Sequence, residues 1–105
     1  LAVVFPAWMK HVCRHDLNRF VQFAVRVWNV ELDFNDPERT AREGIKRLIQ
    51  FFKENGLPTT LSELNIPADR IGEMANKATD YGKKVLGQFV QLTTDDVLAI
   101  YKLAL

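Results

Sequence analysis

The chain has few of the residues from which common catalytic sites are built. It contains one cysteine, one serine and two histidines. A Ser–His–Asp set would have to use Ser62, and that serine lies in a helix-capping pattern. The lone Cys13 cannot form a disulfide within the chain, which fits a reducing, cytoplasmic compartment. The five glycines stand singly, and no two are close enough to form a G-x-G or P-loop that would cradle a nucleotide phosphate.

The chain also lacks a strong charge of either sign. Its formal net charge is +1, and acidic residues are interspersed with basic ones, whereas nucleic-acid binding requires a clustered basic face. The apolar run at residues 1–9 is shorter than the roughly 20 residues that cross a bilayer. It has neither the basic leader nor the small-residue cleavage site of a signal peptide. We therefore expect no nucleic-acid partner and no membrane association.

The composition is that of a soluble globular protein. Hydrophobic residues make up 48% and charged residues 26% of the 105 residues, and these proportions separate the chain from disordered ones. A chain of this length fits one domain. We expect residues 1–105 to form a single all-helical domain.

The apolar residues recur with the period of an α-helix, most clearly after residue 36. Asp36 is a good N-cap and Pro37 suits the first helical position. Gly56 is expected to adopt the left-handed conformation that closes a helix, with Leu57 folding back on the last turn and Pro58 preventing continuation. The apolar stripe of this helix consists of Ala41, Ile45, Leu48, Ile49 and Phe52.

Weaker patterns predict the other helices. Asp16 is expected to cap a helix that ends near Asn29. The spacing of Thr60 and Glu63 matches a capping box and predicts a short helical turn. Further helices are expected over residues 67–82, after a proline, and over residues 93–104, where Thr93 and Asp96 again match a capping box. Residues 83–92 have no clean period. The prediction is an all-α bundle of five or six helices.

The first nine residues, LAVVFPAWM, are apolar on all sides and have helical spacing. A helix of this kind is expected to be buried on every side, and Pro6 is tolerated only in its first turn or at a kink. A natural domain seldom begins inside its own core, because termini are usually solvated. We therefore expect the chain to be the C-terminal piece of a larger protein.

No set of residues predicts an active site. His11 and His15 would share a helix face, as a zinc pair requires, but no third ligand other than Asp16 is near, and a solvated helix end explains them better. Cys13 lacks a partnering base, so we expect a structural thiol. The aromatic residues are expected to form core rather than a ligand box. They are Phe20, Phe23, Trp28, Phe51 and Phe52.

Several segments together resemble the C-terminal helical region of the iron-containing (group III) alcohol dehydrogenases, in particular their NAD(P)H-dependent butanol dehydrogenases. The resemblance covers essentially the whole chain in the right order. The matching segments are residues 1–9 (LAVVFPAWM), 19–30 (RFVQFAVRVWNV), 51–59 (FFKENGLPT), 61–64 (LSEL) and 92–101 (LTTDDVLAIY).

The resemblance implies a two-domain enzyme that interconverts primary alcohols, butanol among them, and aldehydes. In this family an N-terminal domain binds NAD(P)H, and a divalent metal, iron or zinc, is held by one aspartate and three histidines. The last of these histidines precedes the helix that begins here at Leu1, so neither His11 nor His15 takes a ligand role. The resemblance thus implies no catalytic, cofactor-binding or metal-binding residue in this chain, which we expect to be inactive alone. Phe5 and Phe89 are expected to help wall the substrate pocket.

Two further expectations concern partners. The missing N-terminal domain of the same protein is the first partner, and apolar surface left exposed without it is expected to drive homo-oligomer formation. An alternative from another class is a free-standing helical interaction module that offers its apolar opening run to a partner helix.

Overall fold

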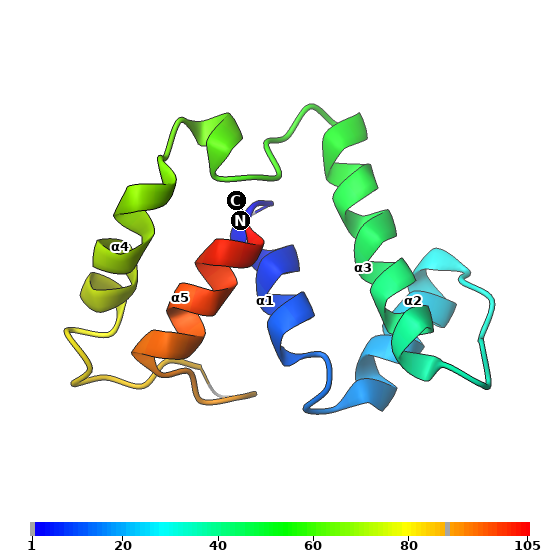
Figure 1. The fold of residues 1–105 in the computed structure, drawn as a ribbon. Coiled ribbons are helices and arrows are strands. Elements are labelled where there is room, and N and C mark those ends of the chain that lie inside the picture. The colour runs from blue at the N-terminus through cyan, green and yellow to red at the C-terminus, as the bar shows by residue number, and fades with distance from the viewer. Residues whose placement is uncertain (1, 88) are drawn as a thin grey trace.

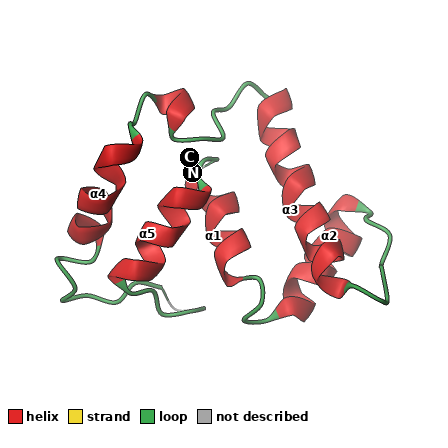
Figure 2. Ribbon diagram, viewed as in Figure 1, coloured by secondary structure: helices red, strands yellow, loops and turns green. Residues whose placement is uncertain are grey.

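The computed structural model describes residues 2–87 and 89–105, and five α-helices with two 3₁₀ turns make up the regular structure of this part (Figure 2). The prediction of an all-α bundle of five or six helices is confirmed. The helices are α1 (Val4–Val12), α2 (Leu17–Trp28), α3 (Pro37–Glu54), α4 (Ile71–Ala78) and α5 (Thr94–Leu103), and the 3₁₀ turns are η1 (Ser62–Leu64) and η2 (Ala68–Arg70).

Helix α1 lies in the middle of the bundle. Figure 1 shows α2 and α3 on one side of it and α4 and α5 on the other. The main contacts join α2 with α3, α4 with α5, and α1 with both α3 and α5. Buried apolar residues from all five helices form one hydrophobic core, among them Met9, Phe20, Ile45, Ala75 and Ile100. No helix of the described residues is both long enough and apolar enough to cross a membrane.

Helix α3 begins and ends as its sequence predicts. The Asp36 carboxylate accepts a hydrogen bond from the Arg39 N–H at 3.1 Å, which caps the first turn. At the other end Gly56 has φ of 76°, and the Leu57 N–H donates to the Phe52 carbonyl at 3.0 Å. This is the Schellman arrangement, which satisfies carbonyls that the last turn would leave unpaired.

Helix α2 has the predicted bounds but not the predicted cap. Asp16 occupies the N-cap position, yet its side chain makes no capping hydrogen bond. Its carboxylate instead pairs with the Arg19 guanidinium, with Oδ2 and Nε 3.0 Å apart. The expectation of a capping Asp16 is therefore wrong, because a charged partner one turn away takes the carboxylate. Asn29 ends the helix with φ of 54°.

Helices α2 and α3 approach each other closely at Gly44. A Cβ atom placed on Gly44 would lie 2.5 Å from the Cβ and 2.7 Å from the Cα of Ala24. Ala24 is fully buried, and its backbone belongs to α2, so neither side can yield without moving a helix. Small residues on both helices thus set the distance between them.

Replacing Gly44 by alanine is expected to lower the free energy of unfolding by about 1–3 kcal/mol, because the added methyl overpacks this contact. Gly72→Ala is the matched control, since a Cβ there meets nothing within 4 Å. It should be neutral or stabilise the chain by up to about 1 kcal/mol through helix propensity. Urea denaturation of both variants measures the difference, and equal effects would contradict the close contact.

The segment between α3 and α4 is less regular than predicted. The Thr60 hydroxyl accepts from the Glu63 N–H at 3.2 Å, but the Glu63 carboxylate turns to the N–H of Thr59 instead of Thr60. Only half of the expected capping box forms, and the helical turn is η1. Pro67 precedes η2, so the α-helix predicted to begin there starts later, at Ile71.

Helix α5 begins with the predicted capping box. The Thr93 hydroxyl accepts from the Asp96 N–H at 3.4 Å, and the Asp96 carboxylate accepts from the Thr93 N–H at 3.0 Å. The same carboxylate lies 3.0 Å from Nε2 of His11, which ties the end of α1 to the start of α5. The pKa of Asp96 is lowered, first by the hydrogen bond from the Thr93 backbone and then by the one from His11.

This lowered pKa predicts a pH-dependent contribution to stability. A carboxyl group whose pKa falls on folding stabilises the fold above its unfolded pKa, and this contribution is lost as the pH falls through the folded value. Asp96→Asn should reduce the free energy of unfolding by about 0.5–1 kcal/mol at pH 7, and the gap from wild type should close as the pH drops below about 4.

Asp95→Asn is the control, because it removes a charge from the same helix end without touching His11. The free energy of unfolding of wild type and of both variants is measured by chemical denaturation at several pH values. A gap for Asp96→Asn that stays constant from pH 7 to pH 3 would contradict this assignment.

Helix α1 differs most from expectation. Its start at Leu1 lies outside the described residues, and the helix runs from Val4, with Pro6 inside the first turn as required. Val4 and Phe5 are 38% and 39% exposed, so the expectation of burial on every side is wrong for this chain. Helices α3 and α5 both contact α1, and the side of α1 that carries Val4 and Phe5 stays partly exposed.

Candidate functional site

Four aromatic rings from three parts of the chain gather beside α1. We call Phe5, Trp8, Phe20 and Phe89 the aromatic cluster. Trp8 lies at its centre, with its ring centroid 5.8 Å from that of Phe5, 5.8 Å from that of Phe89 and 6.4 Å from that of Phe20. Phe5 and Trp8 are three residues apart on α1 and so share a face. Phe20 comes from α2, and Phe89 from the irregular segment between α4 and α5.

Phe89 is held from several directions. Its ring packs edge-on against Phe20 at 6.1 Å and against the imidazole of His15 at 5.4 Å. The Arg19 guanidinium lies over the ring, 5.5 Å from the centroid, as in a cation–π contact. These contacts fix an otherwise irregular segment, whose own backbone bonds include the bridge between Leu86 and Leu92.

The structure brings together the two residues predicted for the pocket wall. Phe5 and Phe89 both contact Trp8, so they belong to one cluster although they are far apart in sequence. Phe20 is buried, whereas Phe5, Trp8 and Phe89 keep part of their surface exposed. Sequence reasoning missed the linking role of Trp8, and the three-residue spacing from Phe5 was the only signal for it.

A second group of aromatic residues joins α2 to α3. Trp28 packs against Phe23 at 6.3 Å and against Phe51 at 5.8 Å. Phe23, Trp28 and Phe52 pack on the core as predicted, but Phe51 is 47% exposed and is not a core residue. The Trp28 Nε1 atom is buried without a hydrogen-bond partner among the described residues.

The two histidines make different contacts. His11 is half-buried and faces Asp96, so the expectation of a merely solvated helix end is wrong for it. His15 follows the end of α1 at Val12, is exposed and packs on Phe89. Among residues 2–87 and 89–105, no three His, Cys, Asp or Glu side chains converge in a way that could hold a metal ion.

Cys13 is a structural thiol. It is 2% exposed, and its Sγ–H donates to the Lys10 carbonyl oxygen at 3.6 Å. Burial, and next the negative charge of Glu38, raise the pKa of the thiol. Because the thiolate is the nucleophilic form, this environment makes Cys13 less reactive than a free cysteine.

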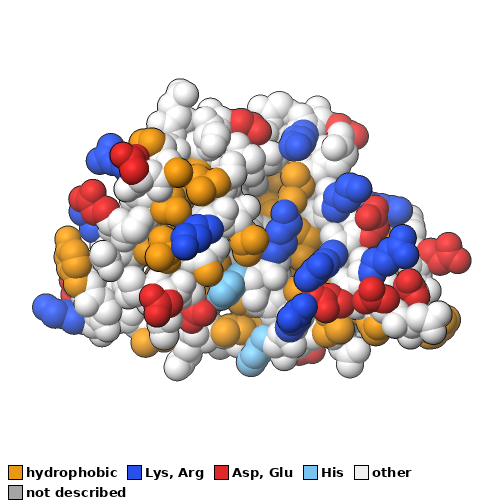
Figure 3. Space-filling view, in the orientation of Figure 1, with side chains coloured by type: hydrophobic (Ala, Val, Ile, Leu, Met, Phe, Trp, Pro, Cys, Tyr) orange, Lys and Arg blue, Asp and Glu red, His pale blue; other side chains and the backbone are white. Residues whose placement is uncertain are grey.

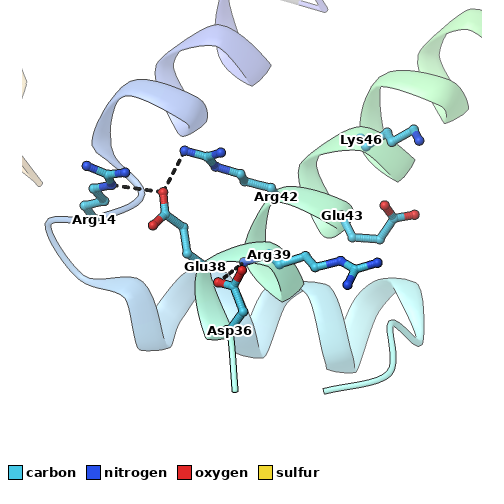
Figure 4. Close-up of a pocket in the computed structure, with 7 residues that line it drawn as sticks. All are labelled: Arg14, Asp36, Glu38, Arg39, Arg42, Glu43 and Lys46. Atoms are coloured by element: carbon cyan, nitrogen blue, oxygen red, sulfur yellow. Dashed lines mark hydrogen bonds and ion pairs between the residues drawn. The ribbon is translucent and has the colours of Figure 1, made fainter. Parts of the chain in front are cut away.

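A charged hollow lies where α3 begins, and Figure 4 shows the residues that line it. Arg14 and Arg42 both point to the Glu38 carboxylate, whose Oε1 accepts from Arg14 Nε at 2.9 Å and from Arg42 Nη2 at 2.7 Å. The hydrogen bond from Arg14 is the main cause of the lowered pKa of Glu38.

These ion pairs make the hollow a structural contact. An incoming anion would meet the Glu38 carboxylate, and the two guanidiniums nearest to it are already paired. The two ion pairs of Glu38 therefore tie the turn after α1 to α3. On the face drawn in Figure 3, basic and acidic side chains are likewise interleaved over α2 and α3.

These features define an all-helical domain that is stabilised by apolar and aromatic packing, and whose described residues form no metal cluster and no activated nucleophile. The family model described as "Fe-containing alcohol dehydrogenase family, C-terminal" matches residues 1–105. The chain belongs to this family.

Named relatives agree with this assignment. The chain is 38% identical over 105 residues to the probable NADH-dependent butanol dehydrogenase 1 of Bacillus subtilis (strain 168), covering 100% of this chain and 27% of that protein. It is 32% identical over 103 residues to NADH-dependent butanol dehydrogenase A of Clostridium acetobutylicum, covering 97% of this chain and 26% of that protein.

A solved structure matches the fold as well. The crystal structure of NADH-dependent butanol dehydrogenase A from Thermotoga maritima superposes with a TM-score of 0.83 at 31% sequence identity. The match covers 98% of this chain and 27% of that one. The chain thus spans about a quarter of the length of the relatives it matches.

Proposed function

We propose that residues 1–105 are the all-helical C-terminal domain of a two-domain alcohol dehydrogenase. The complete enzyme interconverts primary alcohols, butanol among them, and the corresponding aldehydes with NAD(P)H. One observation carries this proposal: the whole chain matches butanol dehydrogenases, but only about 27% of their length. A free-standing interaction module would not account for a match along the whole chain.

The described residues of this chain do not fit a metal site, and its five glycines stand singly, so the sequence has no phosphate-binding loop. His11 and His15 are engaged by Asp96 and Phe89, and no three metal-ligating side chains converge among the described residues. We therefore assign the iron or zinc ion and the NAD(P)H site to the N-terminal domain and its junction with this chain. The isolated chain binds neither and is inactive, and the N-terminal domain is its partner.

The test is an assay of the full-length protein. It should reduce butanal with NADH or NADPH, and a chelator should remove at least about 90% of the rate, which the divalent metal then restores. The isolated 105-residue chain, assayed beside it, should show no rate above background. A full-length protein without NAD(P)H-linked aldehyde reduction would contradict the proposal.

Within the enzyme, Phe5 and Phe89 line the substrate pocket. Phe5 is exposed on α1, and Phe89 belongs to the same aromatic cluster. In the full-length enzyme, Phe89→Ala should raise KM for 1-butanol several-fold and change it little for ethanol, because a longer alkyl chain loses more contact. Kinetics that are unchanged across alcohols of different length would remove Phe89 from the pocket.

We also propose that the enzyme is cytoplasmic and that the isolated chain forms a homo-oligomer. Apolar side chains exposed on this chain, such as Phe34 at 87% and Val27 at 59% exposure, support self-association. Sedimentation velocity of the isolated chain measures its oligomeric state. A monomer at all concentrations would contradict the proposed homo-oligomer.

A further inference from the structure

We propose that Asn55 is a site of spontaneous covalent modification, in which its side-chain amide is converted to a carboxylate, and that the end of α3 controls the rate. The chain has six asparagines, and only Asn55 is followed by glycine. Glycine has no Cβ to shield its backbone nitrogen, so this nitrogen can approach the preceding side chain closely. The inference concerns the chain itself and does not depend on the proposed dehydrogenase reaction.

The reaction needs only water as co-reactant. The Gly56 backbone nitrogen loses its proton and bonds to Cγ of Asn55, the bond from Cγ to Nδ2 breaks, and the leaving nitrogen takes up a proton and departs as ammonia. Water then opens the resulting five-membered imide at one of its two carbonyls. Opening at Cγ gives aspartate, whereas opening at the backbone carbonyl gives isoaspartate, whose main chain runs through Cβ. No group is oxidised or reduced.

The reacting residues lie at the protein surface. Asn55 and Gly56 are exposed, and a Cβ placed on Gly56 would meet nothing within 4 Å. The neighbouring side chains of Phe51 and Leu57 are 47% and 45% exposed. Water therefore reaches this segment, and a helix end that is solvated in this way opens at a low cost in free energy.

The cap of α3 holds the reacting groups apart while it is closed. Nδ2 of Asn55 donates to the Phe51 carbonyl at 2.8 Å, and the Gly56 N–H donates to the Lys53 carbonyl at 3.0 Å. Ring closure requires Cβ of Asn55 and the Gly56 nitrogen to lie on the same side of the Cα–C bond. The ψ of 10° at Asn55 turns them away from each other. Modification therefore requires the last turn of α3 to open.

The product fits the helix end less well than asparagine does. A carboxylate at this position cannot donate to the Phe51 carbonyl, and a negative charge is unfavourable at the C-terminal end of a helix. Isoaspartate also lengthens the main chain by one atom just before Gly56, whose φ of 76° closes the helix. The modification is therefore expected to loosen the end of α3.

The test measures conversion at each asparagine of the full-length protein during incubation in mildly alkaline buffer, with and without urea. Peptide mapping by mass spectrometry follows the change from amide to acid, and chromatography separates aspartate from isoaspartate. In urea, Asn55 should convert at least about tenfold faster than Asn65 or Asn76, which precede larger residues. In the folded protein, conversion of Asn55 should be about tenfold to a hundredfold slower than in urea.

Three variants separate the chemistry from its control by α3. Asn55→Gln should lose conversion at this position, because its longer side chain would have to close a six-membered ring. Phe52→Leu weakens the packing of the last turn on the core, and it should speed conversion of Asn55 several-fold in the folded protein but not in urea. Phe20→Leu makes the same change in the core near the start of α2. It is the matched control and should leave the folded rate unchanged.

The two parts of the proposal fail separately. If Asn55 reacts in urea no faster than the other asparagines, it is not a preferred modification site. If the folded protein converts Asn55 as fast as in urea, or if Phe52→Leu does not speed the folded rate, the end of α3 does not control the reaction. A folded protein that leaves Asn55 intact while the protein in urea converts fully would overturn modification of the native state.

Discussion

The packing of α1 between two helix pairs is the constraint on which the rest of the structure depends. Helices α2 and α3 pack closely through Gly44 and Ala24, and α4 packs on α5, but α1 contacts both pairs. Its buried residues Ala7, Met9 and Val12 belong to the common core. Burial of apolar side chains is the main driving force of folding, so the position of α1 determines how the two pairs share one core.

The same helix organises the candidate site. Its exposed face carries Phe5, the half-buried Trp8 links that face to Phe89, and His11 reaches Asp96 at the start of α5. The irregular segment between α4 and α5 carries Phe89. Contacts of Phe89 with Trp8 of α1 and Phe20 of α2 thereby position this segment. The site consequently depends on aromatic packing more than on the local conformation of the segment that carries Phe89.

The parts of the fold that local chemistry controls could be predicted from the sequence. Asp36 with Pro37, Gly56, and the pair Thr93 and Asp96 act within one helical turn, and each forms as expected. Competition between two hydrogen-bond donors for one capping carboxylate was not predictable. Nothing in the sequence indicates that the Asp16 carboxylate pairs with the Arg19 guanidinium instead of a backbone N–H.

Long-range contacts were harder to predict. The approach of Gly44 to Ala24 and the placement of Trp8 between Phe5 and Phe89 join residues from different elements, and no local pattern encodes them. Phe5 and Phe89 themselves came from the family resemblance and not from spacing or composition. No three metal-ligating side chains converge among residues 2–87 and 89–105, and the chain's own pattern pointed to no reaction.

The hydrogen bond between His11 and Asp96 joins residues 85 positions apart. A ribosome makes the chain from its N-terminus, so α1 emerges long before the helix that covers one of its faces. Until α5 is released, the apolar side chains of α1 that contact it lack their final neighbours. A chain that ended before Thr93 would lack α5 and with it the core residues Val97 and Ile100.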